Sequence, residues 1–118
     1  MMNPSLPLSP DEGLLALAAE RCCTGAQRLV PGGITAMMAL LPEWSATNGV
    51  LCKEFVFPDF DATMAFVNAV AFMARSQNHH PDLAVHYGRC VVTFHTHDAG
   101  GLTRNDFICA ARTERLFA

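Results

Sequence analysis

Residues 48–81 read NGVLCKEFVFPDFDATMAFVNAVAFMARSQNHHP. The Asn-Gly pair at the start of this stretch is the favoured dipeptide of a tight hairpin turn. It predicts a hairpin that joins a short strand around Trp44 to a longer strand over 50–57, which Pro58 ends. The longer strand alternates in hydrophobicity, so one of its faces is expected to point into a core. That face carries Leu51, Phe55 and Phe57, with Lys53 as the exception.

A helix is predicted immediately after this strand. Asp59 or Asp61 can cap its first turn with a side-chain oxygen, and we expect it to run to about Ser76. Its apolar side chains recur at helical spacing and form a stripe wide enough to cover a sheet. The stripe consists of Met64, Val67, Ala71 and Ala74, with Phe66, Val70 and Met73 beside it.

A second pair of strands is predicted after a turn over 78–81, because the residue before a proline is biased away from the helix. Residues 84–97 are predicted to form these two strands, which bend near Gly88-Arg89. Strand parity separates their side chains into two faces. One face carries Val91, Thr93, His95 and His97, and the other carries Cys90, Val92, Phe94 and Thr96.

Both ends of the chain carry helix-start signals. The run Ser9-Pro10-Asp11-Glu12 combines a capping box with a proline at the first helical position, and it predicts a helix to about Cys22. A shorter helix is predicted over 35–41. Near the other end, Thr103-Arg104-Asn105-Asp106 is a capping-box start for a last helix that runs to about Phe117.

The main elements follow in the order helix, strand, strand, helix, strand, strand, helix. Hairpin pairs separated by helices indicate the α+β class, with a four-stranded antiparallel sheet and helices packed on one of its faces. The opposite face of such a sheet would remain open to a partner or to a second subunit.

The composition favours one ordered globular domain and excludes several classes of protein. Of the 118 residues, 51% are hydrophobic and 16% are charged, which argues against disorder. No apolar run approaches the roughly 18 residues of a membrane span, and residues 1–10 do not resemble a signal peptide. We therefore expect no membrane partner and a cytoplasmic location. The formal net charge of -3 gives no electrostatic indication of nucleic-acid binding.

The five cysteines are expected to be reduced thiols, because their number is odd and their spacing is irregular. They are Cys22, Cys23, Cys52, Cys90 and Cys109. The vicinal pair Cys22-Cys23 has the composition of a redox pair or of metal ligands. The favoured interpretation is that both are small residues at the end of a helix.

Three histidines are the main candidates for chemistry, because imidazole donates and accepts protons near neutral pH. His79 and His80 lie at a predicted turn, and His97 ends a predicted strand, so a hairpin would bring the two regions together. A metal site is the alternative, but adjacent histidines rarely bind one ion and no acidic fourth ligand stands out. Acid–base work is the favoured interpretation. His86 and His95 are predicted to be solvated surface residues.

Several motifs of the chain resemble the pterin-4a-carbinolamine dehydratase family. They are Glu54–Phe60, Asn78–Pro81, Tyr87, Thr96-His97 and Gly101–Thr103 with Asp106. The resemblance spans residues 41–118, so we expect a dehydratase-like domain there and an N-terminal helix with a variable extension over 1–40. It also implies a helix-flanked four-stranded sheet and assembly as a homodimer or homotetramer.

The resemblance implies the dehydration of 4a-hydroxytetrahydropterin to quinonoid dihydropterin, which returns the cofactor of aromatic amino-acid hydroxylases. Hydroxide is a poor leaving group, so an acid must protonate the departing oxygen while a base removes a ring N–H proton. By resemblance, His79, His80 and His97 are the catalytic residues, with His79 and His97 as the acid–base pair and His80 orienting the pterin. The resemblance also implies substrate binding by Asp106, Tyr87 and Thr96, with Asp106 either supporting a histidine or contacting the pterin ring. No metal or cofactor is implied, because the pterin is the substrate.

The same family includes proteins that act by binding other proteins, such as a dimerisation cofactor of a homeodomain transcription factor and a Rubisco assembly factor of bacteria with alpha-carboxysomes. Arg75 stands where the family usually has an acidic residue or lysine, and Leu83 stands where it usually has tryptophan. These departures favour a protein-binding scaffold, whereas the intact histidines and Asp106 favour the enzyme.

Overall fold

The structure is a computed structural model that describes residues 7–117. The N-terminal half contains α1 (Pro10–Ala19), α2 (Pro31–Met38), β1 (Ser45–Thr47) and β2 (Val50–Val56). The C-terminal half contains α3 (Phe60–Gln77), β3 (Asp82–His86), β4 (Arg89–Phe94), the 3₁₀ turn η1 (His97–Ala99) and α4 (Arg104–Arg115). The part of the predicted N-terminal extension before residue 7 lies outside this description.

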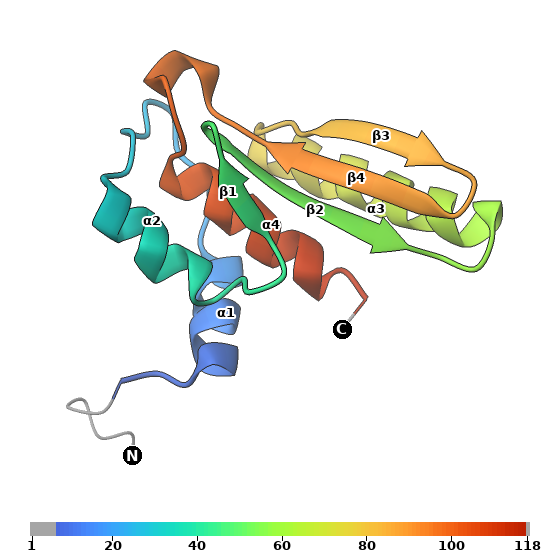
Figure 1. Ribbon diagram of the computed structural model, residues 1–118, viewed down its shortest axis with the longest axis horizontal. Coiled ribbons are helices and arrows are strands. Elements are labelled where there is room, and N and C mark those ends of the chain that lie inside the picture. Colours follow the sequence, from blue (N-terminus) through green and yellow to red (C-terminus); the bar gives the residue numbers. More distant parts are fainter. Residues whose placement is uncertain (1–6, 118) are drawn as a thin grey trace.

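The four strands form one antiparallel sheet in the order β1-β2-β4-β3. Figure 1 shows α3 and α4 on one face of this sheet, and α1 packs against α4. The predicted α+β class, with helices on one face of a four-stranded antiparallel sheet, is therefore confirmed. No helix within residues 7–117 has the length and apolar character needed to cross a membrane.

The predicted hairpin is present and explains why Lys53 interrupts an apolar face. Asn48 and Gly49 both have positive φ, 55° and 77°, as a two-residue turn of this kind requires. Lys53 does point toward the helices, where its ammonium pairs with Glu114 of α4 and lies 2.8 Å from a carboxylate oxygen of Glu43. The charge is thus paired at the margin of the core and not left unpaired within it.

Helix α3 begins where the sequence indicated, but its buried stripe differs from the predicted one. The Asp59 carboxylate caps it by accepting a hydrogen bond from the Ala62 N–H at 2.8 Å. The buried face consists of Thr63, Phe66, Val70, Met73, Ala74 and Gln77. Ala71 is exposed, because the larger Phe66 ring packs against the sheet, with its centroid 4.6 Å from that of Phe55.

Strand β4 confirms one predicted face and corrects the predicted length. Cys90, Val92 and Phe94 are fully buried under the helices, as strand parity predicted. The strand ends at Phe94, so the prediction that His97 ends a strand was wrong. His97 instead opens η1, which is closed by Gly100 at a φ of 71°.

Two helices in the N-terminal part have different bounds from the predicted ones. Helix α1 ends at Ala19 and not near Cys22, because the backbone becomes extended at Glu20, whose carbonyl accepts hydrogen bonds from Arg112 of α4. Helix α2 starts at Pro31, four residues before the predicted start, because proline suits the first helical position. Leu17 of α1 lies in the same core as the strands of the sheet. The domain division at residue 40 stays a prediction.

Candidate active site

Asp106 lies at the centre of the candidate site and is fully buried. It occupies the first turn of α4, where its Oδ2 accepts hydrogen bonds from the Thr103 backbone N–H at 2.9 Å and from the Thr96 hydroxyl at 2.8 Å. Its Oδ1 lies 2.7 Å from Nε2 of His79. One carboxylate therefore joins the start of α4, the segment after β4 and the turn before β3.

His79 is positioned by the end of α3. Asn78 takes a left-handed conformation with a φ of 49°, and the His79 backbone N–H still donates to the carbonyl of Ala74 at 3.2 Å. The imidazole lies nearly parallel to the Phe94 ring, at an interplanar angle of 11°. Its hydrogen bond to Asp106 raises the pKa of His79 against the opposing effect of burial. Because Nε2 faces the carboxylate, Nδ1 is the ring nitrogen that can exchange a proton with a ligand.

His79 lines a cavity of about 500 Å³, which is within the size range of small-molecule sites. Its walls come from four parts of the chain, and most of the side chains are polar. They are Cys22–Ala26, Gln77–His79, Thr96 with Asp98 and Ala99, and Asn105. The catalytic candidate His79 is thus placed beside a space large enough for a bicyclic ring.

His97 lies in a neighbouring cavity of about 430 Å³, and Thr96 lines both cavities. The His97 ring packs edge-on against His95, with centroids 4.1 Å apart, and Nε2 of His95 lies 3.0 Å from a carboxylate oxygen of Asp82. The prediction that His95 is a solvated surface residue was wrong, since only 19% of its side chain is exposed. Its buried Nδ1 finds no hydrogen-bond partner among residues 7–117.

The other predicted site residues differ in how close they lie to these cavities. The side chains of Asp106 and Thr96 form hydrogen bonds to each other, to His79 and to Thr103. Both therefore act chiefly in holding His79. His80 is exposed at the same turn.

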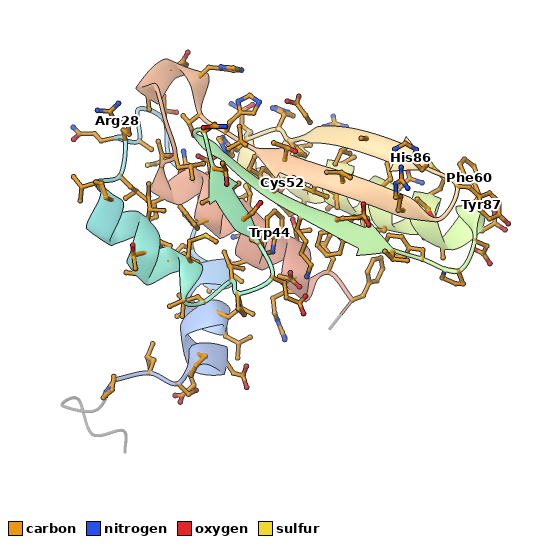
Figure 2. The ribbon with its side chains drawn as sticks, in the orientation of Figure 1. Arg28, Trp44, Cys52, Phe60, His86 and Tyr87 are labelled. Carbon is orange, nitrogen blue, oxygen red and sulfur yellow. The ribbon has the colours of Figure 1, made fainter. Side chains whose placement is uncertain are left out.

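Tyr87 is not brought into either cavity. It is 69% exposed at the β3–β4 turn, where its ring stacks on Phe60 at 6.4 Å. Figure 2 shows Phe60 and Tyr87 at one end of the molecule and Arg28 at the other. Arg28 packs against Gly101, which lines the His97 cavity. The five residues of β3 separate Tyr87 from the His79 turn by about 17 Å.

The cavity wall formed by Cys22–Ala26 was not predicted from the sequence. Two buried amides hold this segment in place. Gln77 accepts a hydrogen bond from the Cys22 backbone N–H at 2.9 Å, and Asn105 bonds to both the N–H and the carbonyl of Cys23, at 3.0 and 2.7 Å. The one signal for it was Gln77, a polar residue in line with the buried stripe of α3.

Metal ligands are not grouped in the described part of the chain. Among residues 7–117, no three histidine, cysteine, aspartate or glutamate side chains are arranged to hold one ion. The hydrogen-bonded Asp106–His79 pair is an arrangement that serves proton transfer, because the carboxylate orients the ring and stabilises its protonated form.

The family model described as pterin 4 alpha carbinolamine dehydratase matches residues 27–116. The chain belongs to this family. A protein of Chromobacterium violaceum, provisionally named pterin-4-alpha-carbinolamine dehydratase, is 50% identical over 101 residues, which are 83% of this chain and 94% of that protein. A protein of Stenotrophomonas maltophilia with the same provisional name is 46% identical over 108 residues, which are 87% of this chain and 93% of that protein.

A solved structure supports the same assignment. The chain is similar to a crystal structure from Brucella melitensis described as a transcriptional coactivator/pterin dehydratase, with a TM-score of 0.74 and 26% identity. The match covers 78% of this chain and all of that one. The dehydratase family match includes His79, His80, His97 and Asp106, whereas the whole Cys22–Ala26 wall precedes it.

Proposed function

We propose that this chain dehydrates 4a-hydroxytetrahydropterin to quinonoid dihydropterin as a hydro-lyase. The observation that carries the proposal is the buried Asp106 carboxylate bonded to His79 beside a cavity of about 500 Å³, in a chain of the pterin dehydratase family. This pair supplies a proton-transfer group next to a cavity of small-molecule size, and the reaction requires little more than proton transfer.

In the proposed reaction, His79 acts as the base. Its Nδ1 takes the proton from the ring N–H, and Asp106 stabilises the imidazolium that forms, as the raised pKa of His79 favours. The C4a–O bond then breaks as the departing oxygen receives a proton and leaves as water. His97 is the proposed acid for this step, with the substrate reaching past Thr96 into the second cavity. His80 is proposed to orient the pterin from the rim.

Arg75 and Leu83, at which the chain departs from the family pattern, lie outside both cavities. Arg75 is exposed on α3, and Leu83 is half-buried against the core from β3. Neither belongs to the residues that line the His79 cavity. The substitution of tryptophan by leucine therefore does not remove a wall of this cavity, which favours the enzyme over a relic pocket.

The test is a rate measurement with chemically generated 4a-hydroxytetrahydropterin. We expect the protein to accelerate dehydration over buffer, and His79→Gln to lower the rate about 10²- to 10⁴-fold. His86→Gln is the matched control, because His86 is exposed on β3 near the Tyr87 end of the sheet, and it should retain the full rate. A rate no faster than that of buffer would refute the proposal.

A second candidate is a protein-binding role, which the coactivator description of the Brucella melitensis protein favours. We propose that the open face of the sheet would serve it, with a Rubisco assembly role as one form. Co-purification with Rubisco tests that form, and Rubisco that assembles equally well without this chain would count against it.

We further propose a cytoplasmic homodimer or homotetramer. The edge strand β3 has exposed Ala84 and Val85, and an unpaired strand edge can accept a second strand. Light scattering on the purified chain measures the mass of the assembly, and a monomer at micromolar concentration would contradict this proposal.

A further inference from the structure

Cys22 and Cys109 are brought together although they lie far apart in the sequence. Their sulfur atoms are 3.5 Å apart. Cys22 follows α1 and lines the His79 cavity, whereas Cys109 is fully buried in the middle of α4. The proposed dehydration uses neither sulfur, so the pair calls for a separate explanation.

The contact between the two sulfurs is held by the surrounding hydrogen bonds. The Cys22 backbone N–H is fixed by Gln77, and the Cys22 sulfur also lies 3.6 Å from the carbonyl oxygen of Asn105. Two residues earlier, the carbonyl of Glu20 accepts hydrogen bonds from the Arg112 guanidinium. Together with the bonds of Cys23 to Asn105, these contacts fix the chain on both sides of Cys22 against α4, so the approach of the sulfurs is built into the fold.

The two thiols have unequal surroundings. The hydrogen bond with Cys109 lowers the pKa of Cys22, and the positive charges of His79 and Arg112 act in the same direction. The same hydrogen bond, together with burial, raises the pKa of Cys109 far above its ordinary value. A thiolate is the reactive form of cysteine, so Cys22 is the nucleophile of the pair and Cys109 is the resolving thiol beside it.

We propose that Cys22 and Cys109 are an oxidative modification site, at which hydrogen peroxide converts the thiol pair to a disulfide in the wall of the His79 cavity. The Cys22 thiolate attacks one peroxide oxygen, so that the S–O bond forms, the O–O bond breaks and hydroxide leaves to become water. Oxidation removes the negative charge of Cys22 that opposed ionisation of Cys109, so Cys109 can give up its proton as it attacks the sulfur of Cys22. The S–S bond forms and the S–O bond breaks. The hydroxyl group leaves with the Cys109 proton as a second water.

The segment that carries Cys22 can supply the small movement that this step requires. The sulfurs must approach from 3.5 Å to about 2 Å. Residues 21–23 lie outside any helix or strand, so a side-chain rotation with a small backbone shift suffices while α4 stays in place. The disulfide would tie the cavity wall covalently to the helix that carries Asp106.

The test is mass spectrometry on the full chain, reduced and then treated with peroxide. We expect the loss of two hydrogen masses and a cross-linked peptide pair that contains Cys22 and Cys109. Cys109→Ser should leave Cys22 as a sulfenic acid that dimedone captures, and Cys22→Ser should leave Cys109 unmodified. Cys23→Ser is the matched control, because this exposed neighbour should not be needed for the cross-link.

Two results would overturn the proposal. One is a cross-link between Cys22 and Cys23, and the other is oxidation of Cys23 or Cys52 while Cys22 stays reduced. Circular dichroism of each variant checks that it is folded, and the mass readout does not depend on dehydratase activity. The dehydration rate of the cross-linked protein can also be measured. A lower rate that recovers after dithiothreitol would show that the disulfide regulates the enzyme, and this additional effect rests on the proposed function.

Discussion

Replacing Asp106 by asparagine would remove a buried charge that three hydrogen bonds share. These bonds come from His79 at 2.7 Å, the Thr96 hydroxyl at 2.8 Å and the Thr103 N–H at 2.9 Å. A hydrogen bond to a charged group contributes about 1 kcal/mol more than a neutral one, so three of them amount to about 3 kcal/mol. The lower cost of burying a neutral amide offsets about 1 kcal/mol. We therefore expect Asp106→Asn to lower the free energy of unfolding by about 2 kcal/mol.

The pH dependence of this loss follows from the raised pKa of His79. In the folded protein this pKa lies above its ordinary value of 6.5, because the ring is hydrogen-bonded to Asp106. The resulting stabilisation is fully present below the unfolded pKa and is lost as the pH rises through the folded one. Asparagine carries no charge, so the Asp106→Asn variant lacks this stabilisation at every pH. The loss of stability in Asp106→Asn should therefore be larger at about pH 6 than at about pH 9.

Urea unfolding at the two pH values measures both effects, and an NMR titration of the His79 ring should show its pKa lowered in the variant. Asp61→Asn is the matched control, since Asp61 is exposed in the first turn of α3 and its loss should cost less than about 1 kcal/mol. An Asp106→Asn variant no less stable than this control would show that the buried carboxylate does not contribute this stability. An equal loss at both pH values would refute the link to the pKa of His79.

Four further substitutions test the stability of the fold, each by urea unfolding. Phe66→Ala should cost about 3–5 kcal/mol, because the buried ring packs against other aromatic rings of the core; a loss below about 1 kcal/mol would contradict this packing. Gly88→Ala should cost about 1–3 kcal/mol, because the new Cβ would lie 3.0 Å from a carbonyl oxygen. Gly32→Ala is its control, because the new Cβ meets open space and should stabilise α2 by up to about 1 kcal/mol. Equal effects of the two substitutions would exclude this explanation. Arg104→Ala breaks an exposed ion pair with Glu20 and should cost less than about 1 kcal/mol, with a smaller loss at high salt.

The parts of the fold that depend on local chemistry were predictable. Asn48-Gly49 takes the positive φ values that its turn requires, and the caps at Ser9 and Asp59 start α1 and α3 where the sequence indicated. The end of α1 was not predictable in this way. It is set by the bonds from Arg112 to the carbonyl of Glu20, a partner 92 residues away in the sequence. No local pattern reports such a contact.

The site was predictable as single residues but not as an arrangement. The capping-box pattern placed Asp106 at the start of α4, and the turn before Pro81 placed His79 at the end of α3. That these two side chains meet depends on how α3 and α4 pack on the sheet. The Cys22–Ala26 wall was missed for the same reason, because only the packing of α1 on α4 places it beside His79.

The capping box of α4 also explains how a charged carboxylate can be fully buried beside His79. A buried charge is costly unless donors satisfy it. The helix start provides one through the Thr103 N–H, the Thr96 hydroxyl provides a second, and His79 provides the third. Because Asp106 is fully buried and both of its oxygens accept hydrogen bonds within the protein, it exposes no polar atom to a substrate, and its effect on chemistry passes through the basicity of His79. The same bonds that start the last helix therefore set the proton affinity of the candidate catalytic base, so a change to this cap that the fold tolerates would still alter the site.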